Sequence, residues 1–365
     1  MKKILYVSSM AFSSEVKGGA VVARRNYDLM CEYFGVDNVF PFGLDCFSLK
    51  NKSAIMKLKA IVLAFYNLIC LRGNGCSKQV EDSIIKFVVE KDIDVVFVES
   101  SLNGRLIRRI KKDCDIVVLS YFHNCEAVLL LKIKNFMNLV RFPFVFLSEK
   151  LSCLYSDYII TLSSRDDLDI RRLYKRCSNL IYPITMCGNA LDTTDQKCVP
   201  YCLFVGSDFM PNNLGISWFV QNVSTKIPFD TYVIGDCCKY LTQSIQIPTC
   251  VHLLGKVDDI RDYYINASCV IIPVFYGSGM KTKTIEAMSY GKTIFGTSEA
   301  FVGIDADFTQ VGGLCNTADE FVKCISNSFV SLTNDYVLNF FRHNFDTNSM
   351  RVKFFRFLDD AFKDL

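Results

Sequence analysis

The sequence predicts an α/β protein built from two parallel-sheet domains. Short apolar runs alternate with longer amphipathic stretches, which is typical of repeated strand–helix–strand units. The chain has 365 residues, more than one ordinary domain needs, and half of them are apolar. A polar stretch from Pro183 to Pro200 has neither helical nor strand periodicity. We therefore expect two domains, joined there, each with its own hydrophobic core.

Eight apolar runs are the clearest candidate strands, four on each side of the polar stretch. Each is nearly continuous in hydrophobic residues, as expected of strands covered by helices on both faces. They are Ile4–Ser8, Val95–Glu99, Ile116–Tyr121, Tyr158–Leu162, Tyr201–Gly206, Thr231–Ile234, Val251–Leu253 and Cys269–Pro273. Two such sheets whose carboxyl ends face one another would leave a ligand-binding cleft between them.

The first residues of the chain and the pattern of cysteines indicate a reducing compartment. The apolar run after Met1 is shorter than the roughly 7–15 residues of a secretory signal, so we interpret it as the first strand. The 17 cysteines are odd in number, scattered and without a C-x-x-C pair, which favours free thiols. We expect a cytoplasmic protein, with peripheral contact to the inner face of the membrane as an open alternative.

Charge differs between the two halves of the chain. Residues 1–190 hold 27 Lys and Arg against 19 Asp and Glu, whereas residues 191–365 hold 14 against 19. A basic half suits nucleic acid or an anionic membrane surface, or it is simply a solvated face. No nucleic-acid recognition motif is present, so that partner is the weakest of the three.

Two basic and apolar stretches of the first half suggest where a membrane could bind. They are Ser48–Arg72 and Leu129–Phe144. Their apolar parts are shorter than the about 20 residues that span a bilayer. Helices of this composition either lie in the membrane interface or face a protein core.

The most informative motif follows the candidate strand that ends at Pro273. Gly277-Ser278-Gly279 forms a glycine-rich turn, and a helix is expected from about Lys281. Backbone N–H groups at such a helix start favour phosphate, and Lys281 and Lys283 add positive charge. Glu286 lies far enough along the helix to reach sugar hydroxyls while the turn holds a diphosphate.

With this motif in place, the second half resembles the retaining glycosyltransferases of the GT-B architecture, of the family 4-like or group 1 type. The matching blocks are Leu203–Asn213 with Gly215 and Trp218-Phe219, then Leu254–Ile260, then Gly277–Gly291. The resemblance implies two Rossmann-like domains facing each other across a cleft. It implies an acceptor-binding domain over 1–185, a donor-binding domain over 200–340, and a C-terminal helix over 341–365 packing towards the first domain.

The resemblance also assigns roles to particular residues. It implies that His123, Glu286 and Lys283 are catalytic. It implies that the donor is bound by Gly18, Gly19, Gly206, Ser207, Gly277, Ser278, Gly279, Met280, Thr282, Lys281, Lys283 and Glu286. Gly18-Gly19 are expected in the loop after the first strand, and His123 after the strand Ile116–Tyr121.

Two departures from the family pattern concern how the donor is held. Ser278 stands eight residues before Glu286, where many members have a carboxylate that approaches the transferred sugar. The arginine that often follows the Val205-Gly206-Ser207 block is also missing. Neutralisation of the diphosphate would then depend on Lys281, Lys283 and the helix dipole.

The resemblance implies transfer of a sugar from a nucleotide-sugar donor, with retention, to a saccharide or lipid-linked acceptor in polysaccharide or glycan synthesis. It implies no cofactor and no obligatory metal. Two alternatives remain open at this point. One is a sugar-nucleotide epimerase of the same fold, and the other is a non-catalytic paralogue that binds a glycan or a partner.

Overall fold

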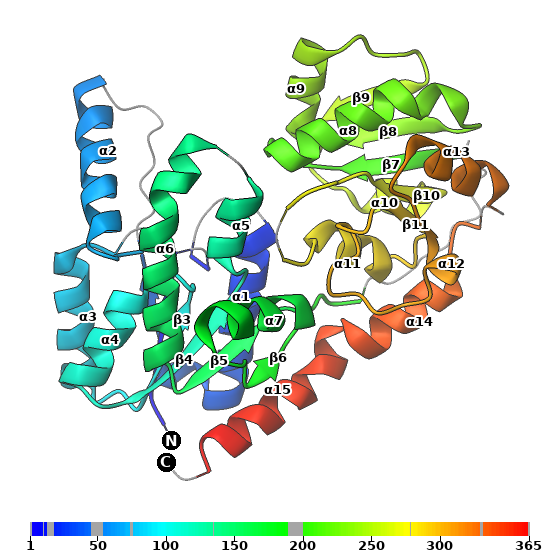
Figure 1. The fold of residues 1–365 in the computed structure, drawn as a ribbon. Helices are drawn as coiled ribbons and strands as arrows, with labels where there is room; N and C mark the ends of the chain where they lie inside the picture. The colour runs from blue at the N-terminus through cyan, green and yellow to red at the C-terminus, as the bar shows by residue number, and fades with distance from the viewer. Residues whose placement is uncertain are drawn as a thin grey trace. The chain divides into compact units, whose positions relative to one another are not determined.

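The chain forms two compact units, each built round a parallel sheet. The computed structural model describes residues 2–9, 11–12, 18–44, 54–73, 76–133, 135–188, 200–277, 279–328 and 331–363. The first unit comprises Met1–Pro183 and Phe355–Leu365, and the second comprises Ile184–Phe354. Within each unit, helices cover both faces of the sheet (Figure 1). Of the expected linker, residues 189–199 lie outside the described part of the chain.

In the described residues the sheet of the first unit has six parallel strands in the order β2-β1-β3-β4-β5-β6. The strands are β1 (Ile4–Ser8), β2 (Val39–Gly43), β3 (Val95–Glu99), β4 (Val117–Phe122), β5 (Tyr158–Thr161) and β6 (Leu180–Ile181). The helices are α1 (Gly18–Phe34), α2 (Ala54–Ile69), α3 (Lys78–Lys91), α4 (Gly104–Asp113), α5 (Glu126–Lys132), α6 (Phe136–Tyr155) and α7 (Ser164–Tyr174).

The core of the first unit lies on both faces of this sheet. Side chains of α3 and α4 pack with β1, β3 and β4 on one face, where α6 and α7 continue the layer over β4 and β5. On the other face, the Tyr6 hydroxyl in β1 lies 2.7 Å from the carbonyl oxygen of Ala23 in α1. Both faces of the strands are therefore buried, which explains their continuous hydrophobic runs.

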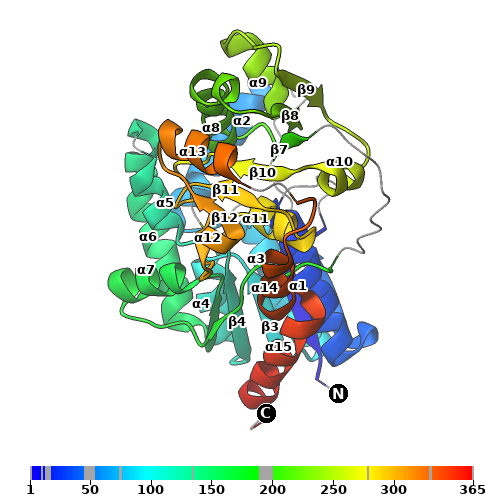
Figure 2. The ribbon, with the colours of Figure 1, turned by 90° about the vertical axis from the view of Figure 1, so that its right-hand side faces the viewer.

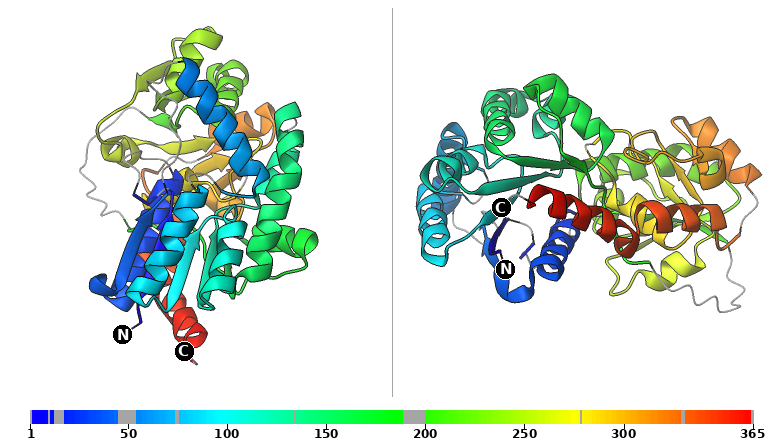
Figure 3. Two further views of the ribbon diagram at one scale, coloured as in Figure 1. Left: turned by 90° about the vertical axis from the view of Figure 1, so that its left-hand side faces the viewer. Right: turned by 90° about the horizontal axis from the view of Figure 1, so that it is seen from below.

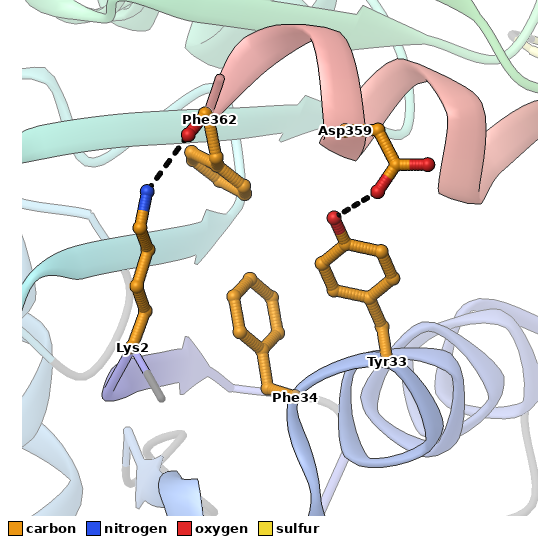
Figure 4. Close-up of a pocket in the computed structure, with 5 residues that line it drawn as sticks. All are labelled: Lys2, Tyr33, Phe34, Asp359 and Phe362. Carbon is orange, nitrogen blue, oxygen red and sulfur yellow. Dashed lines mark hydrogen bonds between the residues drawn. The ribbon is translucent and has the colours of Figure 1, made fainter. Parts of the chain in front are cut away.

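The C-terminal residues pack against α1 of the first unit. Figure 4 shows Tyr33 donating a hydrogen bond to Asp359 at 2.6 Å, and Lys2 donating to the carbonyl oxygen of Phe362 at 2.8 Å. The rings of Phe34 and Phe362 lie 5.7 Å apart between these two bonds. These five residues line a pocket at the end of the chain.

The second unit has, in its described part, six parallel strands in the order β12-β11-β10-β7-β8-β9. The strands are β7 (Tyr201–Val205), β8 (Asp230–Ile234), β9 (Val251–Gly255), β10 (Cys269–Ile272), β11 (Ile294–Gly296) and β12 (Gly312–Leu314). The helices are α8 (Met210–Asn222), α9 (Cys237–Ser244), α10 (Arg261–Asn266), α11 (Thr282–Ser289), α12 (Phe308–Val311), α13 (Ala318–Asn327) and α14 (Asp335–Asn344). Helix α15 (Thr347–Ala361) begins in the second unit, and its residues from Phe355 onward belong to the first.

Helices α8, α9 and α13 cover one face of the second sheet, and α10, α11 and α14 lie on the other (Figure 2). Helix α11 ends where Gly291 adopts a φ of +59°, which favours glycine. The next residue, Lys292, donates its ammonium to the carbonyl oxygens of Ile265, Ala267 and Leu332. Burial lowers the pKa of Lys292 to about 8, and the three carbonyls account for this buried cation as a structural element.

The eight predicted strands are all present, with ends that shift by no more than two residues. Four further strands were not predicted: β2, β6, β11 and β12. Strand β2 contains Pro41 and lies at a sheet edge, where a missing N–H is tolerated. The other three have only two or three residues each, too few to show a period. The described cysteines are free thiols, and no described helix is both long and apolar enough to cross a membrane.

Gly215 in α8 allows this helix to lie directly against the chain that leaves β10. A Cβ atom added there would lie 2.1 Å from the carbonyl oxygen of Pro273. We predict that Gly215→Ala lowers the free energy of unfolding of the second unit by at least about 1 kcal/mol, because overpacking outweighs the gain in helix propensity. Urea denaturation followed by the fluorescence of Trp218, the sole tryptophan of the sequence, measures this.

The exposed Gln221 near the end of the same helix supplies the control. Gln221→Ala should change the stability by less than about 0.5 kcal/mol. If Gly215→Ala instead stabilised the unit, as alanine does at an open helical position, the close contact with Pro273 would be wrong.

Candidate functional site

The order of strands in the second sheet marks one position for a ligand. From β7 the chain proceeds to β8 and β9 on one side, then crosses to β10, β11 and β12 on the other. Strands β7 and β10 are therefore neighbours whose following loops turn in opposite directions. In open parallel sheets, ligands bind outside the carboxyl ends of the strands at such a switch point.

The loop after β10 places the predicted glycine-rich turn at this switch point. Gly279 has a φ of +60°, a conformation that favours glycine, and Met280 is buried beside it. A Cβ atom added to Gly277 would lie 3.2 Å from Cε of Lys281, so glycine leaves room for that side chain. Ser278 lies outside the described residues, so its expected role towards the sugar stays a prediction.

Helix α11 begins directly after this turn, with Thr282 as its first residue. Its N-cap is Lys281, which makes no side-chain capping hydrogen bond, and its first turn has no acidic residue. The first N–H groups of a helix lack partners inside the helix and carry a partial positive charge. Helix α11 therefore presents an uncapped N-terminus, which suits an anion.

Lys283 in this first turn connects the two loops of the switch point. Its ammonium donates a hydrogen bond of 2.8 Å to Oδ1 of Asn212 in α8 and lies 4.3 Å from the centre of the Phe204 ring in β7. Burial lowers the pKa of Lys283 from 10.5 to about 8, although Cys237 and Glu286 act in the opposite direction. The structure thus holds a cation in surroundings that do not neutralise it fully.

Lys281 is in a different electrostatic situation from Lys283. Its ammonium lies 2.9 Å from Oε1 of Glu299 and donates a 2.8 Å hydrogen bond to the carbonyl oxygen of Gly279. The Lys281 and Glu299 side chains are each only 13% exposed. The sequence predicts both lysines as phosphate-binding cations, but Glu299 balances the charge of Lys281.

Glu286 lies one turn further along α11 and is held by a tyrosine of α10. The hydroxyl of Tyr264 donates to Oε2 of Glu286 at 3.0 Å, and the Tyr264 ring stacks on that of Tyr290 at 4.7 Å. Burial raises the pKa of Glu286, while the Tyr264 hydroxyl and Lys283 lower it. The carboxylate is thereby oriented by a rigid pair of rings, and it lies on the same helix as the uncapped N-terminus.

The loop after β7 carries the other predicted donor-binding residues, Gly206 and Ser207. Gly206 is fixed by its neighbours, because its N–H donates to Ile234 and its carbonyl oxygen accepts from Cys237. The Ser207 carbonyl oxygen accepts a 3.1 Å hydrogen bond from the Asn212 side chain. Asn212 therefore joins this loop to Lys283, so the structure brings the predicted residues after β7 and β10 together in one site.

The predicted residues of the first unit lie at the carboxyl end of its own sheet. Gly18 and Gly19 form the first turn of α1 rather than part of the preceding loop, because the helix already begins at Gly18. His123 directly follows β4, and its side chain is 13% exposed. The structure thus places the two glycines after β1 and the histidine after β4, in the same unit.

A buried carboxylate that the sequence analysis did not single out lies beside His123. Glu99 ends β3, is fully buried, and has its Oε1 atom 3.4 Å from Nε2 of His123. It accepts hydrogen bonds from Asn26 at 2.8 Å and from the Tyr6 hydroxyl at 2.6 Å. Burial and the proximity of Glu99 raise the pKa of Tyr6 well above its ordinary value. Glu99 therefore fixes the surroundings of His123.

Asn212, Tyr264 and Glu299 were also missed by sequence reasoning. None belongs to the glycine-rich motif, and each reaches the site from another helix or loop. In the sequence, the position of Asn212 after β7, within the Leu203–Asn213 block, was the one feature that could have indicated its role. The described residues contain no cluster of three or more His, Cys, Asp or Glu side chains suited to a metal ion.

Comparison with known families finds a match, and it lies within the second unit. Residues 199–328 match the family model described as glycosyl transferases group 1. The matched residues lie within the second unit, which is therefore similar to a group 1 glycosyltransferase domain. The match covers both loops of the switch point, from Gly206 and Asn212 to Lys283 and Glu286. No curated protein sequence matches the chain.

Solved structures are similar in fold to the whole chain. Sucrose-phosphate synthase from Thermosynechococcus elongatus has a TM-score of 0.72 at 14% identity, over 100% of both chains. The lipopolysaccharide outer core galactosyltransferase WaaB in its apo form has 0.63 at 14%, also over 100% of both. Anabaena Alr3699/HepE in complex with UDP-glucose has 0.66 at 13%, over 99% of this chain and 100% of that one. These similarities confirm the predicted fold class.

The partly buried cation predicts an unusual response to substitution. We expect Lys283→Met to raise the free energy of unfolding of the second unit by about 1–2 kcal/mol near pH 7. A pKa shift from 10.5 to about 8 means that the buried charge costs at most about 3 kcal/mol of stability. Losing the hydrogen bond to Asn212 offsets about 1 kcal/mol of the gain from removing that charge. Urea denaturation followed by Trp218 fluorescence measures the difference.

The stability that Lys283→Met adds should depend on pH, and the direction of this dependence is defined. Between pH 8 and 10.5 the unfolded wild type binds more protons at position 283 than the folded protein, so the wild type gains stability as pH rises. The advantage of Lys283→Met is therefore complete below about pH 8 and shrinks towards pH 10. Lys239→Met, at a side chain that is 79% exposed, is the matched control. A less stable Lys283→Met variant near pH 7 would contradict the account.

Proposed function

We propose that this protein transfers a sugar from a nucleotide-sugar donor to a saccharide or lipid-linked acceptor in glycan synthesis. The observation that carries the proposal is the cation Lys283 at the uncapped N-terminus of α11, at the switch point of a domain similar to the group 1 glycosyltransferases. A diphosphate supplies the negative charge that this arrangement lacks. Glu286, oriented by Tyr264, accepts hydrogen bonds from the ribose hydroxyls.

In the proposed reaction the bond between the sugar and the diphosphate breaks, and negative charge develops on the leaving phosphate. Lys283 and the first N–H groups of α11 stabilise that charge more strongly in the transition state than in the ground state. Lys281 contributes less to this stabilisation, because Glu299 already balances its positive charge. Protein cations and the helix dipole thus supply the positive charge that a metal ion would otherwise supply. We therefore propose that binding of the donor needs no metal.

UDP-sugars are the donors to test first. HepE is described in complex with UDP, with UDP and glucose, and with UDP-glucose. The proposal for this chain includes transfer with retention of the anomeric configuration. It also includes His123 as a catalytic residue from the first unit, positioned by Glu99.

Lys283→Met provides the decisive variant, because it removes the charge at position 283 and is expected to stabilise the fold. We predict that it weakens binding of UDP or a UDP-sugar by at least about tenfold, since a charge-assisted hydrogen bond contributes about 1.5–3 kcal/mol. Sugar transfer to a membrane-extract acceptor should fall at least as much. Calorimetry measures the binding, and Lys239→Met should bind like the wild type.

The same titration has a second, independent readout in its pH dependence. Phosphate binding favours the protonated amine and raises its pKa above 8, so wild-type affinity should be constant below about pH 8. Above it, affinity should fall by up to about tenfold per pH unit. Lys283→Met should lack this decline. If no nucleotide or nucleotide sugar shifts the melting curve at about millimolar concentration, the donor-site proposal is wrong.

Product analysis separates the proposal from its two alternatives. An epimerase would convert the nucleotide sugar without an acceptor, and a binding protein would release no nucleotide from it. The proposed transferase releases nucleoside diphosphate only as the acceptor gains a sugar. The configuration of the new bond, determined by NMR, tests retention, and the same assay with a chelator tests the independence from metal.

A further inference from the structure

Helix α2 is an apolar helix that projects from the first unit with little cover. In Figure 3 its far end extends beyond the helices that cover the sheet. Residues 62–66 are all exposed, including Val62 at 61% and Tyr66 at 57%. A surface helix ordinarily hides an apolar stripe and exposes a polar face. In the part of the chain that the structure describes, consecutive apolar residues of α2 instead face solvent, which is typical of a binding surface.

The neighbouring helices continue the same apolar surface. Leu68 of α2 packs with Leu130 of α5 and Val145 of α6, which joins the three helices into one layer. Near this layer the start of α6 exposes Phe136 at 77% and Leu139 at 68%. We refer to the exposed large apolar residues of α2, of α5 and of the first turn of α6 as the apolar surface. They are Val62, Leu63, Phe65, Tyr66, Ile69, Leu131, Phe136, Met137 and Leu139.

The sequence around the apolar surface contains cations and lacks anions. Residues 46–71 contain four Lys and not one Asp or Glu, and residues 127–148 contain three Lys and Arg and no acidic residue. Lys59 on α2 and Lys132 on α5 are exposed. Two copies of this surface would bring like charges together, which opposes self-association. An anionic surface with an apolar interior matches both properties.

We propose that the apolar surface binds an anionic lipid bilayer, with α2 lying in the membrane interface. At 16 residues α2 is shorter than the about 20 residues that span a bilayer, so interfacial insertion is the mode that fits it. Phe65, Tyr66 and Val62 enter the boundary between headgroups and acyl chains. Lys59 and Lys132 remain at the level of the lipid phosphates. This inference does not depend on the donor site.

Flotation of the full-length protein with vesicles tests the proposal. The vesicles contain phosphatidylcholine and phosphatidylglycerol in about a 2:1 ratio, with phosphatidylcholine alone as the comparison. The wild type should float with the anionic vesicles, much less with the neutral ones, and less as salt is added. Phe65→Ser/Tyr66→Ser should reduce the bound fraction about tenfold or more, since both side chains are already exposed and their loss spares the core.

Matched controls separate the apolar surface from general effects. Val36→Ser/Val89→Ser removes two apolar side chains that are 70% and 67% exposed elsewhere on the first unit, and should float like the wild type. Lys59→Glu/Lys132→Glu should reduce binding about tenfold or more, at about 1 kcal/mol for each lost lysine. The exposed pair Lys112→Glu/Lys363→Glu makes the same change of net charge outside the surface and should reduce binding less.

Three results would overturn the proposal. The wild type could stay unbound to both kinds of vesicle, or it could bind neutral vesicles as well as anionic ones. The protein could also be a dimer in light scattering that Phe65→Ser/Tyr66→Ser converts to a monomer, without vesicle binding. That last result would assign the apolar surface to a second copy of the chain. Donor binding by all these variants should equal that of the wild type, which keeps this test separate from that of the donor site.

Discussion

The hydrogen bond between Lys283 and Asn212 is the interaction on which the candidate site depends. It joins the loop after β7 to the helix after β10, the two neighbours at which the order of strands reverses. The contact of Gly215 with Pro273 brings α8 close enough for this bond. The ring of Phe204 lies below the same ammonium. Much of the second unit's local architecture therefore serves to hold one cation at the end of α11.

The buried ammonium of Lys283 destabilises the folded protein when no ligand is bound. Burial lowers the pKa of Lys283 to about 8, which means that the charged form is destabilised in the folded unit. Lys292, with a similarly lowered pKa, has three carbonyl oxygens round it and needs no ligand. Lys281 has Glu299. Carbonyl oxygens surround Lys292 and a carboxylate pairs with Lys281, whereas the ammonium of Lys283 donates a hydrogen bond to the neutral Asn212. This difference in partners supports the binding of an anion at Lys283.

The sequence predicted the fold class, and it singled out most of the residues that meet at the switch point, for clear physical reasons. Buried parallel strands leave continuous apolar runs, and a glycine-rich turn before a helix is visible in the chain itself. Strands β11 and β12 were missed because three residues carry no periodicity. Tyr264, Glu299 and Glu99 were missed because each acts from another element, and only the folded chain brings it to Glu286, Lys281 or His123. The neutralisation of Lys281 could not be predicted for the same reason.

Chemical modification of Lys283 in the presence and absence of nucleotide tests the central claim most directly. Only neutral amines react with acetic anhydride, and a pKa of about 8 leaves part of the Lys283 amines neutral near pH 7.5, so their reaction can be followed beside that of the exposed Lys239. Mass spectrometry of the peptides gives both rates. The account predicts that saturating UDP or UDP-sugar slows modification of Lys283 at least about tenfold and leaves Lys239 unchanged. Equal rates at Lys283 with and without bound nucleotide would contradict it.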